Sequence, residues 1–297
     1  MSVEKRATIV SSATAATLVA IKMIIGVMSG SVAVLASAID SLLDLVISAF
    51  NYFALHNAQK EADDSFHFGR SKMEPLAAVI EGTIISLSAL FILYEAISKL
   101  IYPRDMEFVT ASIAVMIISI IITTLLVFYL NRVAKKTDNM VIKADALHYK
   151  TDIVSNAIIL LSLILVSATG YEVIDALLGF AIAIYMIYSA YPLVKEGVLM
   201  LLDAALDPAE IKTITDILDA NPQTANYHHL QTRESASHIF VSVHIVFNVS
   251  TSLYDAHLVC DKAELAIKKA FVGKKVHILI HMDPYDDSQI NDLEDLY

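Results

Sequence analysis

The chain has 297 residues, of which 56% are hydrophobic and 18% are charged, and its formal net charge is −11 at pH 7. This composition is too apolar for a soluble domain and indicates a polytopic membrane protein. The acidic balance argues against a nucleic-acid partner, which would need a basic patch. The single cysteine, Cys260, excludes an internal disulfide and a thiolate cluster, so any metal site must use histidine and carboxylate ligands.

Six apolar segments are each long enough to cross a lipid bilayer, which takes about 20 residues. They run over residues 7–28, 32–55, 76–100, 108–130, 141–168 and 173–202. Lysine and arginine are concentrated in the N-terminus and in the connections on one side of this topology. By the positive-inside rule, we expect both termini in the cytoplasm.

Two of these segments carry ionisable side chains four residues apart. The second contains Asp40 and Asp44, and the fifth contains His148 and Asp152. Residues at i and i+4 share a helix face, so each pair can close on one ion. Charged groups in hydrocarbon cost about 2.5 to 3.5 kcal/mol each, and a bound divalent cation offsets that cost. Three carboxylates and an imidazole suit Zn²⁺ first, then Fe²⁺, Mn²⁺, Co²⁺ or Cd²⁺. The alternative is that the aspartates of the second segment pair with lysines or helix ends near the membrane surface.

The loop over residues 56–74 is the most polar stretch of the membrane half. Asp63, Asp64 and His67 form a candidate for a second, weaker ion site in this loop. A solvated run of charges explains the same residues equally well, and both interpretations stay open.

After residue 206 no apolar run is long enough to span a membrane. The pattern predicts helices over 207–220 and 253–271 and strands over 227–233, 238–247 and 276–282. This αββαβ order predicts a ferredoxin-like α+β domain. We therefore expect a six-helix transmembrane transport domain over 1–206 and a cytoplasmic metal-binding dimerisation domain over 207–297.

The strands of this second domain carry histidines on one face. Strand alternation places His281 and Asp283 together as a chelating pair. His244 lies on the open face of the preceding strand, and His228 and His257 are candidates to complete a cluster. A lone strand histidine is usually a surface residue, and this alternative stays open for each of them.

Together these motifs resemble the cation diffusion facilitator family, and the chain is similar to its bacterial zinc and ferrous-iron efflux branch. The resemblance rests on the two i, i+4 pairs, the loop sequence FGRSKME and the strand sequence LIHMDP, and it covers all six spans and the C-terminal domain. It implies a homodimeric exporter in the bacterial inner membrane that exchanges a cytoplasmic divalent metal for periplasmic protons by alternating access. Zn²⁺ is then both the transported and the regulatory ion, Fe²⁺ and Cd²⁺ are further substrates, and the protein is not an enzyme.

The resemblance also assigns roles to individual residues. It places the transported ion at Asp40, Asp44, His148 and Asp152. It places a binuclear cytoplasmic site at His228, His244, His257, His281 and Asp283. It implies a charge pair between Lys72 and Asp203 near the dimer seam. Phe66 and Arg70 stand where the family's loop site has histidines, so we expect that loop site to be degraded or absent.

Two classes of function remain open at this point. A proton-coupled antiporter needs proton-exchangeable ligands within the membrane, and His148 with the three carboxylates provides them. The other class is a membrane metal sensor or partner-binding subunit without transport. An intramembrane hydrolase would need a further carboxylate as general base, and we identify none on the two ligand-bearing spans.

Overall fold

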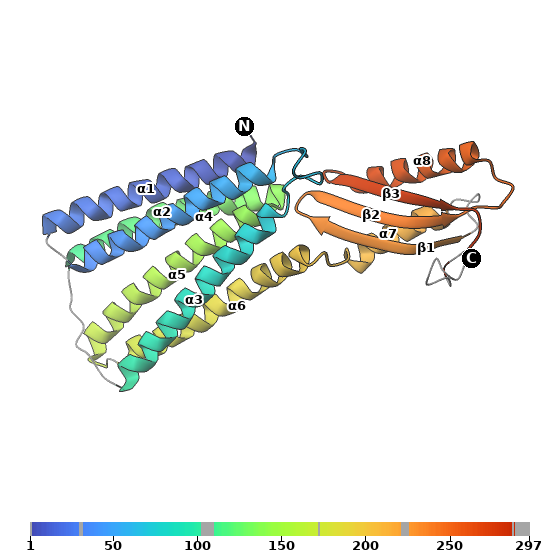
Figure 1. The fold of residues 1–297 in the computed structure, drawn as a ribbon. Helices are drawn as coiled ribbons and strands as arrows, with labels where there is room; N and C mark the ends of the chain where they lie inside the picture. Colours follow the sequence, from blue (N-terminus) through green and yellow to red (C-terminus); the bar gives the residue numbers. More distant parts are fainter. Residues whose placement is uncertain are drawn as a thin grey trace. The chain divides into compact units, whose positions relative to one another are not determined.

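The computed structural model, drawn in Figure 1, describes residues 2–29, 32–101, 110–171, 173–220, 226–286 and 288. The chain divides into two compact units, Met1–Val198 and Leu199–Tyr297. The division falls slightly before the boundary after residue 206 that we expect from the sequence.

The first unit consists of long helices. They are α1 (Val3–Ser29), α2 (Val32–Ala58), α3 (Met73–Ile101), α4 (Thr110–Thr137), α5 (Met140–Thr169) and α6 (Val173–Leu201). All six are long and apolar enough to cross a membrane. The six predicted spans are therefore confirmed, although the first two residues predicted for the fourth span, 108 and 109, lie outside the described residues.

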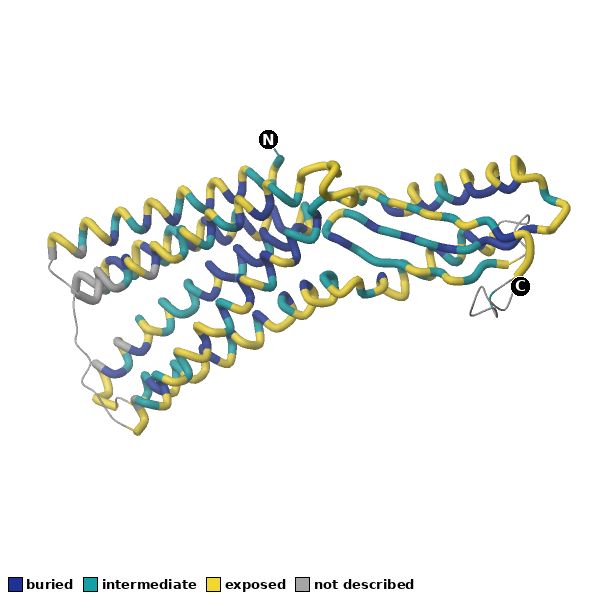
Figure 2. The backbone as a smooth tube through the Cα atoms, in the orientation of Figure 1, coloured by how far each residue is buried: buried dark blue, intermediate teal, exposed yellow. Residues whose placement is uncertain are grey.

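The helices of this unit carry exposed large apolar side chains along their length. Figure 2 marks the exposed positions in yellow. This is the arrangement expected of a bundle solvated by lipid, whose helix contacts are made instead by small residues. A Cβ atom at Gly82 would lie 2.6 Å from Val194 Cγ2, and one at Gly197 would lie 2.6 Å from Val79 Cγ2. Only glycine permits such a close approach of α3 and α6.

Helix α5 connects two apolar clusters of the bundle. Ile142 and Tyr149 pack with residues of α1 and α4 in one cluster. Leu147, Val154 and Ile158 pack against Ile85, Ala89, Ile182, Met186 and Ala190 of α3 and α6 in the other. The helix that carries His148 is therefore held by packing on two sides.

The second unit is a small α+β domain. Its elements are α7 (Pro208–Asp219), β1 (Asn226–Ser235), β2 (His238–Val246), α8 (Leu253–Ala270) and β3 (Lys275–Asp283). The sheet order is β1-β2-β3, with β1 antiparallel and β3 parallel to β2. The predicted αββαβ order is confirmed. The parallel pairing of β2 and β3 requires a crossover connection, and α8 provides it.

One face of this sheet forms a hydrophobic core with both helices. Ile239 and Val243 of β2 are fully buried and belong to one cluster with Ile214 of α7 and Ile267 of α8. Because side chains alternate along a strand, the polar residues of β2 lie on the opposite face. This open face carries the histidines.

The core of the second unit allows a matched test of stability. Ile267→Ala should lower the free energy of unfolding by about 2–5 kcal/mol, because Ile267 is fully buried in α8. Leu265→Ala on the same helix should change it by less than about 0.5 kcal/mol, because Leu265 is 54% exposed. Urea unfolding of the segment Leu199–Tyr297, followed by circular dichroism, measures both. Equal losses in the two variants would contradict the packing of α8 described above.

Candidate metal centres

The first cluster of ligand-type side chains joins α2 to α5 in the membrane unit. His148 Nε2 lies 3.1 Å from Asp44 Oδ1 and 3.7 Å from Asp152 Oδ2. One ligand atom from each of the three residues lies within 4.8 Å of the others. Two ligand atoms of a tetrahedral zinc ion, each about 2.0–2.1 Å from the metal, are roughly 3.4 Å apart. The three side chains are therefore spaced as ligands of one ion.

Accessibility differs among these three side chains. That of His148 is 9% exposed, whereas those of Asp44 and Asp152 are 23% and 32% exposed. The two carboxylates are therefore partly accessible, whereas the imidazole is buried inside the bundle. Asp40 precedes Asp44 by one turn of α2, but its side chain lies outside the described part of the structure. Its role as fourth ligand stays a prediction.

Hydroxyl groups join the helices next to this cluster. Tyr149 Oη lies 2.9 Å from Ser48 Oγ, and Ser48 Oγ lies 3.1 Å from Ser11 Oγ. All three side chains are buried, and they come from α5, α2 and α1. Because Tyr149 follows His148 and Ser48 lies one turn after Asp44, these bonds set the spacing of the two ligand-bearing helices.

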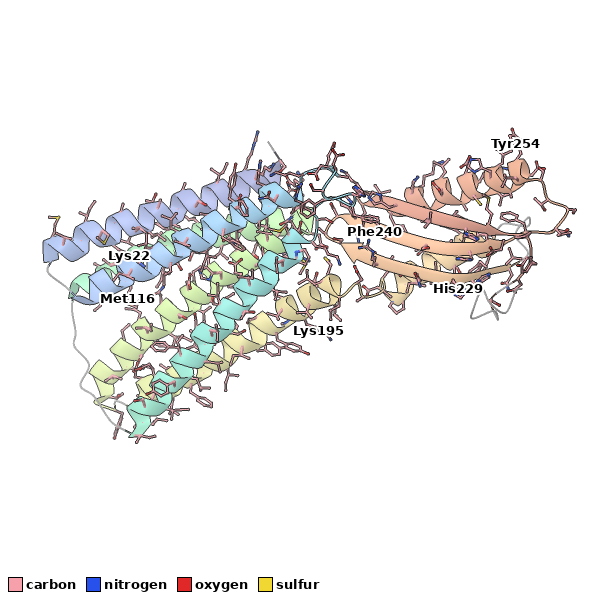
Figure 3. All side chains as sticks on the ribbon, in the orientation of Figure 1. Lys22, Met116, Lys195, His229, Phe240 and Tyr254 are labelled. Atoms are coloured by element: carbon pink, nitrogen blue, oxygen red, sulfur yellow. The ribbon has the colours of Figure 1, made fainter. Side chains whose placement is uncertain are left out.

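A lysine that the sequence analysis did not single out lies in this half of the bundle. Lys22 of α1, labelled in Figure 3, is 8% exposed and donates to Ser41 Oγ at 2.7 Å and to the Ser37 carbonyl at 3.3 Å. Asp44 pairs instead with His148. For Asp44, this pairing favours the metal-site interpretation over pairing with a lysine.

A second buried polar group in the bundle was also missed. Glu81 of α3 and Asp145 of α5 are 1% and 0% exposed. Asn51 Nδ2 of α2 donates to Glu81 Oε2 at 2.9 Å and to Asp145 Oδ1 at 3.5 Å. The statement that the ligand-bearing spans offer no further carboxylate was therefore wrong. The signal was an aspartate three residues before His148 in an apolar helix.

The loop between α2 and α3 uses its carboxylate in a different way. Asp63 Oδ2 lies 2.7 Å from Arg70 Nη2, and the Arg70 guanidinium also stacks 4.1 Å from the centre of the Phe66 ring. Hydrogen bonding to Arg70 lowers the pKa of Asp63 below its usual value. Asp64 and His67 are exposed, and the groups of metal-ligand side chains found among the described residues lie elsewhere. Arg70, which stands at one of the family's histidine positions, thus forms an ion pair with the Asp63 carboxylate.

The second cluster surrounds Asp283 at the end of β3. Asp283 Oδ2 lies 2.9 Å from His244 Nδ1 and 3.3 Å from His228 Nε2, whereas Oδ1 lies 3.0 Å from His281 Nε2. His228, His244 and Asp283 have ligand atoms within 4.8 Å of one another. Two imidazoles and a carboxylate are a donor set typical of zinc. The buried carboxylate thus faces different histidines through its two oxygens.

A β-bulge shapes this second cluster. His228 pairs with His244 across β1 and β2, but the register shifts between His228 and Gln231. Within the bulge His229, labelled in Figure 3, has a φ of 49°, which is uncommon for a residue other than glycine. Bulges re-aim neighbouring side chains and are frequent beside functional sites. Strand alternation in the sequence does not reveal this feature.

Three other predicted site residues lie apart from these clusters. His257 Nε2 of α8 lies 3.7 Å from Asp261 Oδ2 on its own helix, and its side chain is 65% exposed. Asp203 pairs with Arg233 at 3.2 Å within the second unit, whereas Lys72 belongs to the first unit. The roles assigned to His257 and to the Lys72–Asp203 pair stay predictions.

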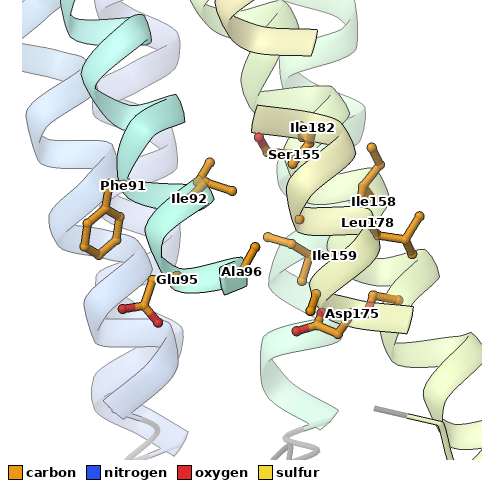
Figure 4. Close-up of a pocket in the computed structure, with 13 residues that line it drawn as sticks. Phe91, Ile92, Glu95, Ala96, Ser155, Ile158, Ile159, Asp175, Leu178 and Ile182 are labelled. Carbon is orange, nitrogen blue, oxygen red and sulfur yellow. Dashed lines mark hydrogen bonds between the residues drawn. The ribbon is translucent and has the colours of Figure 1, made fainter. Parts of the chain in front are cut away.

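An apolar pocket lies between α3, α5 and α6, away from both clusters. Figure 4 shows it lined by isoleucines and Phe91 together with two carboxylates, Glu95 and Asp175. Asp175 Oδ1 accepts a hydrogen bond from Ser162 at 2.6 Å. These two residues provide membrane carboxylates outside both groups described above.

Comparisons with known proteins agree with this architecture. Residues 8–202 match the cation efflux transmembrane domain, and residues 206–285 match the cytoplasmic domain of cation efflux proteins. The cation-efflux pump FieF of Salmonella paratyphi A is 38% identical over 279 residues, which cover 94% of this chain and 92% of that protein. The pumps of Salmonella agona and Salmonella schwarzengrund show the same identity and coverage. A solved structure of CzrB in its Zn form matches 27% of this chain and 90% of its own at 30% identity, with a TM-score of 0.25.

The resemblance inferred from the paired motifs is thus confirmed over both units. The helices that bear those motifs lie within the matched transmembrane domain. This multi-pass membrane protein belongs to the cation efflux family.

Proposed function

We propose that the chain is a homodimeric, proton-coupled exporter that moves Zn²⁺ from the cytoplasm to the periplasm across the bacterial inner membrane. The observation that carries the proposal is the cluster of Asp44, His148 and Asp152 inside a unit of membrane-length helices. Ionisable residues inside membrane segments are rare and mark ion pathways. Fe²⁺ and Cd²⁺ are further substrates, and both termini are cytoplasmic.

The ligands come from two helices, and this favours transport over a metal sensor without transport. A site shared by α2 and α5 opens or closes when these helices move relative to each other, as alternating access requires. The partly exposed carboxylates supply a route for the ion, and the imidazole supplies a nitrogen ligand. Such a borderline donor set suits zinc better than manganese or magnesium.

Residues 1–206 form the transport domain in this proposal, and residues 207–297 form a metal-dependent dimerisation domain. The match of residues 206–285 to the family's cytoplasmic domain supports the second assignment. His228, His244 and Asp283 hold one regulatory ion, and the second oxygen of Asp283 binds another ion together with His281. For His257 to contribute, its side chain must leave Asp261. A Lys72–Asp203 pair at the dimer seam would compete with Arg233 for Asp203.

The membrane site is tested by replacing one ligand with an uncharged isostere. Asp152→Asn should reduce zinc transport by at least about 100-fold, because the loss of an outer-shell partner of a metal ligand already costs about 10- to 100-fold in affinity or activity, and Asp152 is itself a ligand in this proposal. The control is Asp175→Asn, which removes a membrane carboxylate outside the cluster and should retain transport. Zinc uptake into sealed vesicles containing the purified protein measures both. Full transport by Asp152→Asn would refute the site assignment.

Proton coupling is tested by varying pH and the pH gradient. Metal ligation requires a neutral His148 and ionised carboxylates, so protons and zinc compete for the same atoms. Apparent zinc affinity should fall between pH 7.5 and pH 6, by up to about tenfold per pH unit for each proton displaced. A proton gradient directed against zinc movement should accelerate zinc flux in tight vesicles. Flux that ignores the gradient would leave the sensor or a facilitated channel as the better description.

The cytoplasmic site is tested on the segment Leu199–Tyr297, which has its own core. Zinc titration by calorimetry should show more than one ion bound per chain, with an increase in thermal stability by mass action. His244→Ala should remove the tightest of these ions, because His244 contacts the buried Asp283 carboxylate. His277→Ala is the control, because this residue of β3 pairs with His238 instead. If His244→Ala binds zinc as the wild type does, the cluster is not a zinc site and its histidines are ordinary surface residues.

A further inference from the structure

Three helices of the membrane unit converge on a carboxylate–amide–carboxylate group that is distinct from the metal ligands. It consists of Asn51 of α2, Glu81 of α3 and Asp145 of α5, and each side chain is at most 1% exposed. The Asn51 amide nitrogen donates to Glu81 Oε2 at 2.9 Å and, less closely, to Asp145 Oδ1 at 3.5 Å. One neutral amide group therefore donates hydrogen bonds to two buried carboxyl groups.

The hydrogen bonding of this group is incomplete. Glu81 Oε1, Asp145 Oδ2 and Asn51 Oδ1 are all buried and have no hydrogen-bond partner. Each of these atoms is an oxygen acceptor, so the group lacks donors rather than acceptors. An unsatisfied buried acceptor is destabilising by about 1–3 kcal/mol, and more when it is charged.

The charges around this group also indicate that it lacks a proton donor. In the described part of the chain, neither Glu81 nor Asp145 forms an ion pair with a lysine or arginine. The charged side chains that act on Glu81 include Asp145, His148 and Asp152 of α5. Those that act on Asp145 include His148 of its own helix and Asp44 of α2, with the Ser11 hydroxyl of α1 also facing it. Two close carboxylates in a medium of low dielectric constant do not both ionise, because like charges disfavour the ionised form.

A single proton on Glu81 reduces both the shortage of donors and the buried negative charge. A hydrogen on Glu81 Oε1 neutralises one buried carboxylate, and it supplies the kind of donor that Asn51 Oδ1 lacks. A protonated Glu81 and the Asn51 amide then each offer one donor and one acceptor. Asp145 keeps the amide bond from Asn51 and remains the ionised member of the group.

We propose that Glu81 is a proton-binding site, separate from the metal ligands, which gives up its proton when zinc binds in the membrane. This inference rests on the proposed antiport function. Asn51 lies on the helix of Asp44, and Asp145 lies on the helix of His148, so movement of α2 and α5 changes the contacts of Glu81 on α3. Positive charge at the metal site also favours an ionised Glu81, because the electrostatic field of that site extends to Glu81.

Infrared difference spectroscopy of the full-length protein in detergent tests this site directly. Zinc added to the metal-free wild type at pH 7 should remove the carbonyl band of a protonated carboxylic acid. Glu81→Gln should lack that band, and Glu81→Asp should restore a band of the same type. The control Glu95→Gln changes the same charge on the same helix at the pocket of Figure 4 and should leave the band unchanged.

Proton counting gives a second measurement on the same samples. Zinc calorimetry in buffers of different ionisation enthalpy should show about one proton fewer released per zinc ion in Glu81→Gln than in the wild type. Zinc binding by the variant shows that it is folded. A wild type without the band, a band that persists in Glu81→Gln, or an unchanged proton count would each overturn the proposal. Zinc flux that ignores a pH gradient, with the band still lost in Glu81→Gln, would overturn the antiport function and leave the proton site standing.

Discussion

The contact between His148 and Asp44 is the interaction on which the membrane unit depends. It joins α2 and α5 through a 3.1 Å approach of an imidazole nitrogen and a carboxylate oxygen. Charged groups persist inside an apolar bundle only when they are paired, solvated or bound to an ion. The serine and tyrosine hydroxyls beside this contact hold the two helices at the distance that it needs. An ion bound at this site would therefore contact both helices at once.

Polar groups in this unit lie in two neighbouring places with different chemistry. The cluster of Asp44, His148 and Asp152 combines nitrogen and oxygen donors with partial exposure, which suits a borderline cation. The group around Asn51 has oxygen acceptors, one amide donor and full burial, which suits a proton. Because α2 and α5 contribute to both places, a change in one alters the electrostatic field at the other. For the proposed exchange of a metal ion for protons, a shared pair of helices is a simple physical basis.

In the cytoplasmic unit, a sheet rather than a helix bundle brings the ligand-type side chains together. Its core face is closed by α7 and α8, and the histidines lie on the opposite face of the sheet. Asp283 is buried at the end of β3 and contacts His228, His244 and His281 through its two oxygens. The parallel register of β2 and β3 places His244 opposite His281, and the bulge in β1 brings His228 beside them. Backbone geometry therefore determines which histidines meet.

The order of elements in both units followed from the sequence alone, because hydrophobic length and periodicity report directly on membrane spans, strands and helices. The two i, i+4 pairs also followed, since four-residue spacing on a helix is a local property. Other features depended on tertiary structure. The convergence of Asn51, Glu81 and Asp145 joins three helices, and no local spacing within one helix reports on that contact. The ion pair between Asp63 and Arg70 and the bulge at His229 likewise depend on tertiary contacts and backbone angles. No simple pattern in the sequence encodes these contacts and angles.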